Sequence, residues 1–233
     1  MTQVDLWTLE AELCTPDTQP LCGVDEAGRG PVLGPLVIAA VAAVDDRALR
    51  ELHVKDSKQL TKKKRAELAP LISACARVET LVISAAEIDA YRLNGSLNDL
   101  EAAGFATLIQ RLQPAQAYVD AADVKAERFA EVIRQQLDFK LDLVAAHKAD
   151  ATFPIVSAAS VVAKNLRDEL IEAIAAEFGE PIGSGYPGDA VTRNFIERWL
   201  RRHGTFPPHT RTSWKTAQEI ASQIKITKLT DWE

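Results

Sequence analysis

The most restrictive feature of this sequence is a strand, a helix and a second strand that follow one another in the middle of the chain. Ala117 to Val119 is a short apolar run, and Asp123 precedes apolar residues at helical spacing. Leu141, Leu143 and Ala145 then alternate with polar residues, as in a half-buried strand. Such a unit makes two parallel strands with the helix packed on one face. The chain must therefore contain a sheet covered by helices.

Other segments extend this sheet. Apolar runs rich in β-branched residues at 21–24, 35–44 and 78–84 predict three more strands, and a hairpin through 28–34 joins the first two. Helices are expected after the capping residues Thr61, Ser84 (with Glu87 as a capping box), Asn98 and Asp189, and after Pro154. Pro70 predicts a kink or an early stop in the first of them. Gly179 is expected to end the helix after Pro154, and Gly204 the helix after Asp189. We expect an α/β fold with a mixed five-stranded sheet over 1–180 and a helical C-terminal extension over 181–233.

Composition excludes several classes of protein. Of the 233 residues, 47% are apolar and 26% are charged, which is typical of a globular domain. No window approaches the roughly 18 uninterrupted apolar residues of a membrane span, and the N-terminus lacks the pattern of a signal peptide, so we expect a cytoplasmic protein. The three cysteines form no CxxC pair, which argues against a disulfide framework or a zinc site.

The charges are unevenly placed. The net charge is −6, yet the windows 55–65 and 191–217 hold twelve of the 27 basic residues. Basic stripes on an acidic protein suit a polyanion bound along one face. Two solvated helix faces would give the same pattern, and charge alone does not separate the two interpretations.

Four carboxylates stand at strand ends. Asp25 and Glu26 continue an apolar strand, where an unpaired charge is costly to bury, although a strand end that turns into solvent would explain them too. Asp120 ends the fourth strand, and Asp150 follows the fifth, one strand–helix–strand unit later. A right-handed crossover places both at the carboxyl edge of the sheet, where open α/β sheets bind ligands.

Acids that converge there need cations. Like charges about 4 Å apart repel by about 4 kcal/mol at an effective dielectric constant near 20. Oxygen ligands without Cys or His suit Mg²⁺ or Mn²⁺, and two such ions bridged by one carboxylate, for which we choose Asp25, are the usual device for hydrolysis at phosphorus. Asp123 is expected to cap a helix rather than bind metal. The residues thus predict phosphodiester hydrolysis.

Several sequence blocks resemble those of the ribonuclease HII family, in family order. They are Gly23–Pro31, Gly34–Val37, Asp56–Leu60, Tyr118–Asp120, His147–Asp150, Ser157–Lys164, Gly183–Pro187 and Arg211–Lys215. The last block and the long helical C-terminus are similar to the archaeal and eukaryotic branch. The resemblance implies a ribonuclease H-like fold with Asp25, Glu26, Asp120 and Asp150 as the catalytic, metal-binding set. It also implies cleavage of RNA in RNA/DNA hybrids and incision 5′ to ribonucleotides embedded in DNA, leaving 3′-hydroxyl and 5′-phosphate ends, as ribonucleotide excision repair requires.

The resemblance also implies substrate contacts. Gly28, Arg29 and Gly30 would approach the ribose 2′-hydroxyl, with Arg29 on a phosphate; without the family, these residues predict only a tight turn. Tyr186 would stack on the deoxyribose beyond the ribonucleotide, although an aromatic residue in such a loop is often a packing plug. Further expected contacts, some in the C-terminal extension, are Lys58, Lys164, Arg211, Ser213 and Lys215.

Two other functions compete with this one. A resolvase-like or integrase-like nuclease would also use clustered acids, but it would not inspect a 2′-hydroxyl. A non-catalytic hybrid-binding module would have no use for four repelling carboxylates. The tail after Gln223 matches the sliding-clamp pattern only in part, since Leu229 and Thr230 stand where two aromatics are expected, so we favour an amphipathic helix end over a clamp ligand. We expect a monomer.

Overall fold

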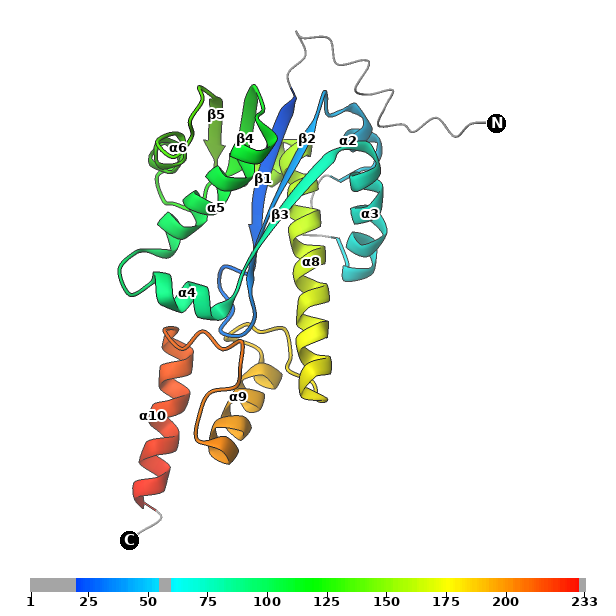
Figure 1. Ribbon diagram of the computed structural model, residues 1–233. Helices are drawn as coiled ribbons and strands as arrows, with labels where there is room; N and C mark the ends of the chain where they lie inside the picture. The colour runs from blue at the N-terminus through cyan, green and yellow to red at the C-terminus, as the bar shows by residue number, and fades with distance from the viewer. Residues whose placement is uncertain (1–19, 55–59, 231–233) are drawn as a thin grey trace.

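The centre of the molecule is a mixed five-stranded sheet. The structure, a computed structural model, describes residues 20–54 and 60–230, the last six by their backbone alone. The strands are β1 (Leu21–Ala27), β2 (Leu36–Ala43), β3 (Arg77–Ile83), β4 (Gln116–Asp120) and β5 (Asp142–Ala146), in the order β3-β2-β1-β4-β5 (Figure 1). β1 pairs antiparallel with β2, as β2 does with β3, whereas β1–β4 and β4–β5 are parallel. The predicted sheet, hairpin and parallel unit are confirmed.

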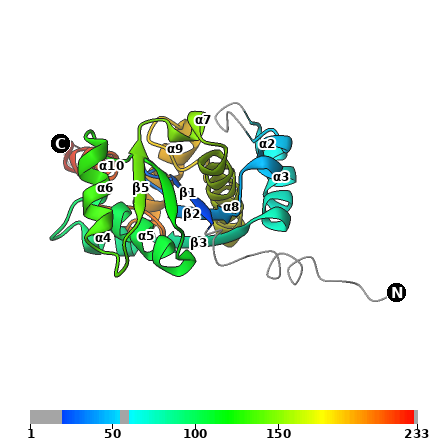
Figure 2. The ribbon, with the colours of Figure 1, turned by 90° about the horizontal axis from the view of Figure 1, so that it is seen from above.

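Helices cover both faces of the sheet (Figure 2). They are α2 (Arg47–Glu51), α3 (Lys62–Cys75), α4 (Ala85–Tyr91), α5 (Leu97–Leu112), α6 (Ala126–Arg134), α7 (Ala149–Thr152), α8 (Pro154–Phe178), α9 (Ala190–His203) and α10 (Lys215–Thr230). Leu36 and Ile38 of β2 share a core with α5 and α6, while Val37 and Ala39 share one with α3 and α8. Because β2 is buried on both faces, its sequence is a continuous apolar run.

A glycine sets how closely α8 approaches the sheet. A Cβ atom at Gly23 of β1 would lie 2.4 Å from the backbone of Ile155, near the start of α8. Only a residue without a side chain allows this approach. The close contact brings Ser160 and Lys164 of α8 beside the end of β1, where the acids stand.

Several predicted helix boundaries need correction. The N-cap of α5 is Ser96, whose hydroxyl accepts the N–H of Asp99, and not Asn98. Asp123 is not the cap of α6, which starts after Lys125; its carboxylate accepts the Lys125 N–H ahead of the helix. Ser96, two residues before Asn98, thus takes the capping role at α5, whereas α6 has no side-chain cap. Pro70 lies inside α3 without ending it, because α3 continues to Cys75.

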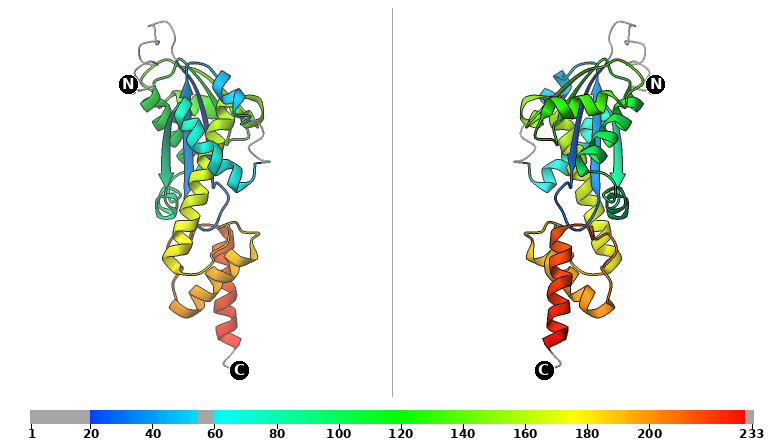
Figure 3. Two further views of the ribbon diagram at one scale, coloured as in Figure 1. Left: turned by 90° about the vertical axis from the view of Figure 1, so that its right-hand side faces the viewer. Right: turned by 90° about the vertical axis from the view of Figure 1, so that its left-hand side faces the viewer.

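The C-terminal helices extend beyond one end of the sheet (Figure 3). α9 and α10 pack around Ile174 at the far end of α8 and around Val32 and Leu33 of the β1–β2 connection. The extension therefore shares a core with the loop that follows β1. None of the helices in the described part of the chain has the length and apolar character that a membrane span requires.

Candidate active site

Three of the four predicted acids meet at the ends of β1 and β4. The register pairs Val24 of β1 with Val119 of β4, so Asp25 and Asp120 come next on neighbouring parallel strands. Glu26 follows Asp25, and its N–H donates to the Asp25 carboxylate at 2.7 Å. Asp150 lies in α7, a helix that the sequence did not predict, and it is buried. The Asp120 carboxylate accepts the N–H of Ala149, at the start of α7, at 3.1 Å, which ties the two regions together.

The acids disturb one another's ionisation. Burial, more than any other cause, raises the pKa of Asp25 to about 7; Asp120 raises it further, while a hydrogen bond from Ser160 and the charge of Lys164 oppose the shift. Burial and then the charges of Asp25 and Asp120 raise the pKa of Glu26 well above its usual value. Carboxyl groups that resist ionisation in this way gain from a nearby cation.

The acids do not, however, form the tight cluster that we expected. Among residues 20–54 and 60–230, no group of three His, Cys, Asp or Glu side chains is arranged to hold a metal ion. Asp25 accepts the N–H of Glu26 and a hydrogen bond from Ser160. The donor set still fits a hard divalent ion, because it offers only oxygen ligands and because Glu26 Oε2 is buried with no hydrogen-bond partner among the described residues.

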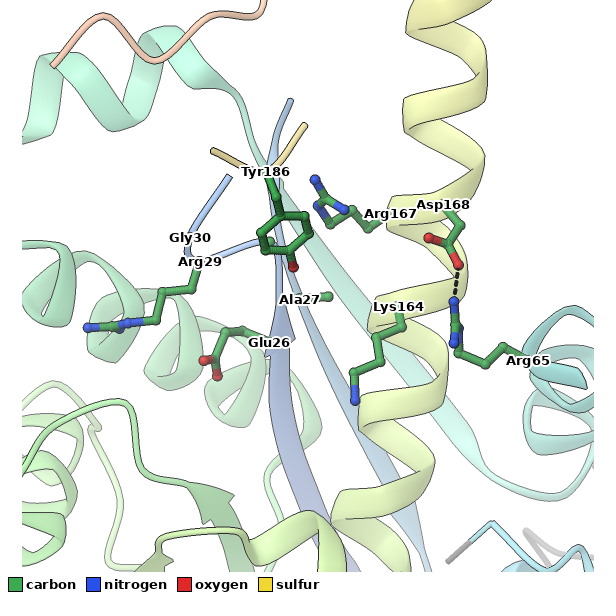
Figure 4. A pocket seen from close by; sticks show the side chains of 10 residues that line it. Glu26, Ala27, Arg29, Gly30, Arg65, Lys164, Arg167, Asp168 and Tyr186 are labelled. Carbon is green, nitrogen blue, oxygen red and sulfur yellow. Dashed lines mark hydrogen bonds and ion pairs between the residues drawn. The ribbon is translucent and has the colours of Figure 1, made fainter. Parts of the chain in front are cut away.

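A cavity of about 440 Å³ opens beside Glu26 (Figure 4). The backbone of Gly28, Arg29 and Gly30 forms one wall of the cavity, and Lys164 and Arg167 of α8 form another. The ring of Tyr186, which is 44% exposed, hangs over the space and stacks on the guanidinium of Arg167 at 5.1 Å. A loop from the β1–β2 connection, an aromatic ring and a carboxylate thus line one cavity.

The Arg29 side chain lies elsewhere. It points away from Tyr186 (Figure 4), forms an ion pair with Glu101 of α5, and donates to Asn98 Oδ1 at 2.6 Å. Glu101 is fully buried. In this structure the Arg29 guanidinium is held by Glu101 and Asn98 while the side chain stays 37% exposed, and its phosphate contact remains a prediction.

The C-terminal contacts are also placed differently from the expectation. Arg211 is fully buried and donates to backbone carbonyls, so it is not available to a phosphate. The Ser213 hydroxyl donates to Asp89 at 2.6 Å. Lys215 is exposed beside Glu219, and Lys164 donates to Ser160 at 2.7 Å at the edge of the cavity. Lys58 lies outside the described residues.

Several cations in the described part of the two basic windows form ion pairs. Lys62 and Arg65 of α3 pair with Glu172 and Asp168 of α8, each at 2.5 Å. On α9, Arg198 pairs with Glu180 and Arg201 with Glu197. Surface pairs of this kind contribute little to stability, but they lower the local positive charge. Both interpretations of these windows, a nucleic-acid-binding face and solvated helix faces, remain predictions.

Two residues of this region, Arg167 and Glu101, were not predicted from the sequence. Arg167 is 6% exposed, and Glu101 has no exposure at all. The sequence contains an indication of both residues. A charged residue on the apolar face of a predicted helix becomes buried, so it must pair with another group or belong to a functional site. Glu101 stands four residues before Phe105 of the α5 stripe, and Arg167 follows Ala163 of α8 at the same spacing.

The raised pKa of Asp25 predicts how stability depends on pH. Its pKa is 3.8 in an unfolded chain and about 7 in the fold, so between these values folding takes up a proton. The free energy of unfolding of the metal-free protein should therefore fall as the pH rises from about 4 to about 7. Urea unfolding in EDTA across this range tests it, with Asp25→Asn as the comparison. Equal pH slopes for the two proteins would contradict the shift.

The fold and the site define a class of protein. A mixed sheet in this strand order, with acids at the ends of the neighbouring strands β1 and β4, is a ribonuclease H-like nuclease fold. The crystal structure of the ribonuclease H2 from Pyrococcus horikoshii superposes with a TM-score of 0.83 at 41% identity, covering 88% of this chain and 99% of that one.

The sequence comparisons narrow the class to a family. The model of the family "Ribonuclease HII" matches residues 22–217, and the chain belongs to this family. The ribonuclease HII of Pyrococcus abyssi is 46% identical over 90% of this chain and 95% of its own length. That of Archaeoglobus fulgidus, solved in a complex with PCNA, is 40% identical with a TM-score of 0.80 and covers 86% and 96% of the two chains. The protein is an endonuclease of the ribonuclease H type, and these relatives are archaeal, as the C-terminal block predicted.

Proposed function

We propose that this enzyme hydrolyses the RNA strand of RNA/DNA hybrids and incises duplex DNA 5′ to an embedded ribonucleotide, leaving 3′-hydroxyl and 5′-phosphate ends. The observation that carries the proposal is the shared cavity of Glu26, the Gly28–Gly30 backbone and Tyr186. A 2′-hydroxyl is the group that distinguishes RNA from DNA at one position, and a backbone without side chains can approach it closely. Recognition of the 2′-hydroxyl and hydrolysis of the phosphodiester would then occur in the same cavity.

The acids would hold two divalent ions, Mg²⁺ or Mn²⁺, through Asp25, Glu26, Asp120 and Asp150. Such ions lower the pKa of an attacking water and stabilise the leaving oxygen. The protein itself would position the carboxylates that bind these ions. β1 and β4 present Asp25 and Asp120 side by side, Ser160 holds the Asp25 carboxylate by a hydrogen bond, and Lys164 keeps a positive charge beside it. Tyr186 would support the sugar that follows the ribonucleotide.

We do not include a sliding clamp among the proposed partners. The Archaeoglobus fulgidus relative has been solved with PCNA, which makes a clamp the natural partner to consider. In this chain the tail departs from the clamp-binding pattern at Leu229 and Thr230. The proposed partners are RNA/DNA hybrids and ribonucleotide-containing duplex DNA.

The test is a matched pair of DNA duplexes, one with a single ribonucleotide and one without, offered with Mg²⁺. A site that recognises a hydroxyl by hydrogen bonds rejects the analogue without it by roughly 10⁴-fold, so we expect one cut 5′ to the ribonucleotide and none in the all-DNA control. Denaturing gels with strand-specific labels locate the cut and its ends. Equal cutting of both duplexes would instead favour a resolvase-like nuclease.

A further inference from the structure

Arg211 reaches from the C-terminal extension to the loop that lines the cavity. Its Nη2 donates to the carbonyl of Gly28 at 2.6 Å, its Nη1 to that of Arg29 at 3.0 Å and its Nε to that of Gly34 at 3.0 Å. One buried side chain therefore holds three carbonyls of the β1–β2 connection. The planar fork of arginine suits this task, because its donors point in fixed directions.

Trp214 completes the arrangement. Its indole Nε1 donates to the carbonyl of Gly30 at 3.2 Å, and its ring lies 4.9 Å from the Arg211 guanidinium. The carbonyls of Gly28, Arg29 and Gly30 are thus all engaged by residues of the same C-terminal block. Burial, and then the charge of Arg167, lowers the pKa of Arg211 to about 9, so Arg211 is still a cation at neutral pH.

The direction of these carbonyls fixes the direction of the N–H groups. In a trans peptide the C=O of one residue and the N–H of the next point to opposite sides. With the Gly28 and Arg29 carbonyls turned to Arg211, the N–H groups of Arg29 and Gly30 face the other way. Neither N–H has an acceptor among the described residues, and both residues line the cavity.

We propose that Arg211 is a positioning residue that turns the loop carbonyls into the protein, so that the loop meets the ribose 2′-hydroxyl with the N–H groups of Arg29 and Gly30. The 2′-hydroxyl then acts as the acceptor in these contacts. Pro31 has no N–H, so the donor pair ends at Gly30. This inference rests on the proposed function and gives the C-terminal extension a part in substrate selection rather than in phosphate binding.

The test compares Arg211→Lys, which keeps the charge but loses the fork, with Trp214→Phe, which removes one donor and keeps a ring. Arg111→Lys, at the exposed end of α5, is the matched control. For each protein we would measure kcat/KM on the duplex with one ribonucleotide, and Kd for the all-DNA duplex at several salt concentrations. Displacement of a binding group by about 1 Å can cost roughly 100-fold in rate, so we expect a loss of this order for Arg211→Lys and a smaller loss for Trp214→Phe.

Affinity for the all-DNA duplex and its dependence on salt should not change in either variant. Weaker binding of the all-DNA duplex by Arg211→Lys, by the same factor as its loss of ribonucleotide cutting, would identify Arg211 as a phosphate contact and overturn the inference. Normal ribonucleotide cutting by both variants would overturn it too. If Arg211→Lys does not fold, the same two measurements on Trp214→Phe test the inference. Failure of the unchanged protein to prefer the ribonucleotide would instead count against the proposed function.

Discussion

Asp25→Asn should abolish cleavage and leave the protein folded. The substitution removes a negative charge and keeps an oxygen that can accept the Glu26 N–H and the Ser160 hydroxyl. We expect kcat to fall at least roughly 1,000-fold, which corresponds to about 4 kcal/mol and lies within the contribution of a metal ion to catalysis. The melting temperature without metal should stay the same or rise near neutral pH, because a buried charge and its repulsion from Asp120 are removed.

Metal-dependent stability separates this loss from misfolding. A ligand that binds only the folded state raises its stability in proportion to the logarithm of its concentration. Mg²⁺ should therefore raise the melting temperature of the unchanged protein and have little effect on Asp25→Asn. Asp45→Asn, an exposed acid paired with Arg47, is the matched control and should behave as the unchanged protein. Full activity of Asp25→Asn, or an undiminished Mg²⁺ effect, would show that Asp25 is not a metal ligand.

Local signals predicted the fold well. The capping box of Ser84 and Glu87 and the left-handed glycine after α8 involve neighbours in the chain, so their patterns are visible in the sequence. The five strands followed from apolar runs of the right length, and the placement of Asp25 beside Asp120 followed from the topology of parallel strands. Short elements such as α7 were missed because four residues carry no periodicity.

The direction of long side chains could not be predicted in this way. Arg29 was expected on a phosphate, but its partner Glu101 is 72 positions away, and nothing local indicates which of two polar environments its side chain enters. The resemblance implied that Arg211 contacts the substrate, whereas in the structure its guanidinium donates to backbone carbonyls. Distance between metal-binding acids is likewise not set by topology alone, since each carboxylate also responds to nearby N–H and O–H donors.

The buried pair of Arg29 and Glu101 should respond unequally to removal of its two partners. Glu101 is fully buried, whereas the Arg29 side chain is 37% exposed. Arg29→Gln leaves a buried carboxylate without its cation, and losing one partner of a buried pair typically costs about 3–5 kcal/mol of unfolding free energy. Glu101→Gln leaves a cation that can still reach water and Asn98, so it should cost less. Urea unfolding of both variants measures the difference, with Arg111→Gln, on the exposed end of α5, as the control.

The double variant Arg29→Gln/Glu101→Gln completes the test. Two amides at these positions leave no buried charge and can hydrogen-bond to each other, so the double variant should be more stable than Arg29→Gln alone. This non-additivity identifies the unpaired carboxylate, rather than lost packing of the arginine stem, as the cause of the instability. Equal losses in the two single variants, or strict additivity in the double one, would mean that the pair contributes no specific coupling between α5 and the loop. With coupling present, the same ion pair that fixes the Arg29 side chain also keeps its guanidinium out of the cavity, which leaves the space beside Glu26 to the loop backbone and the substrate.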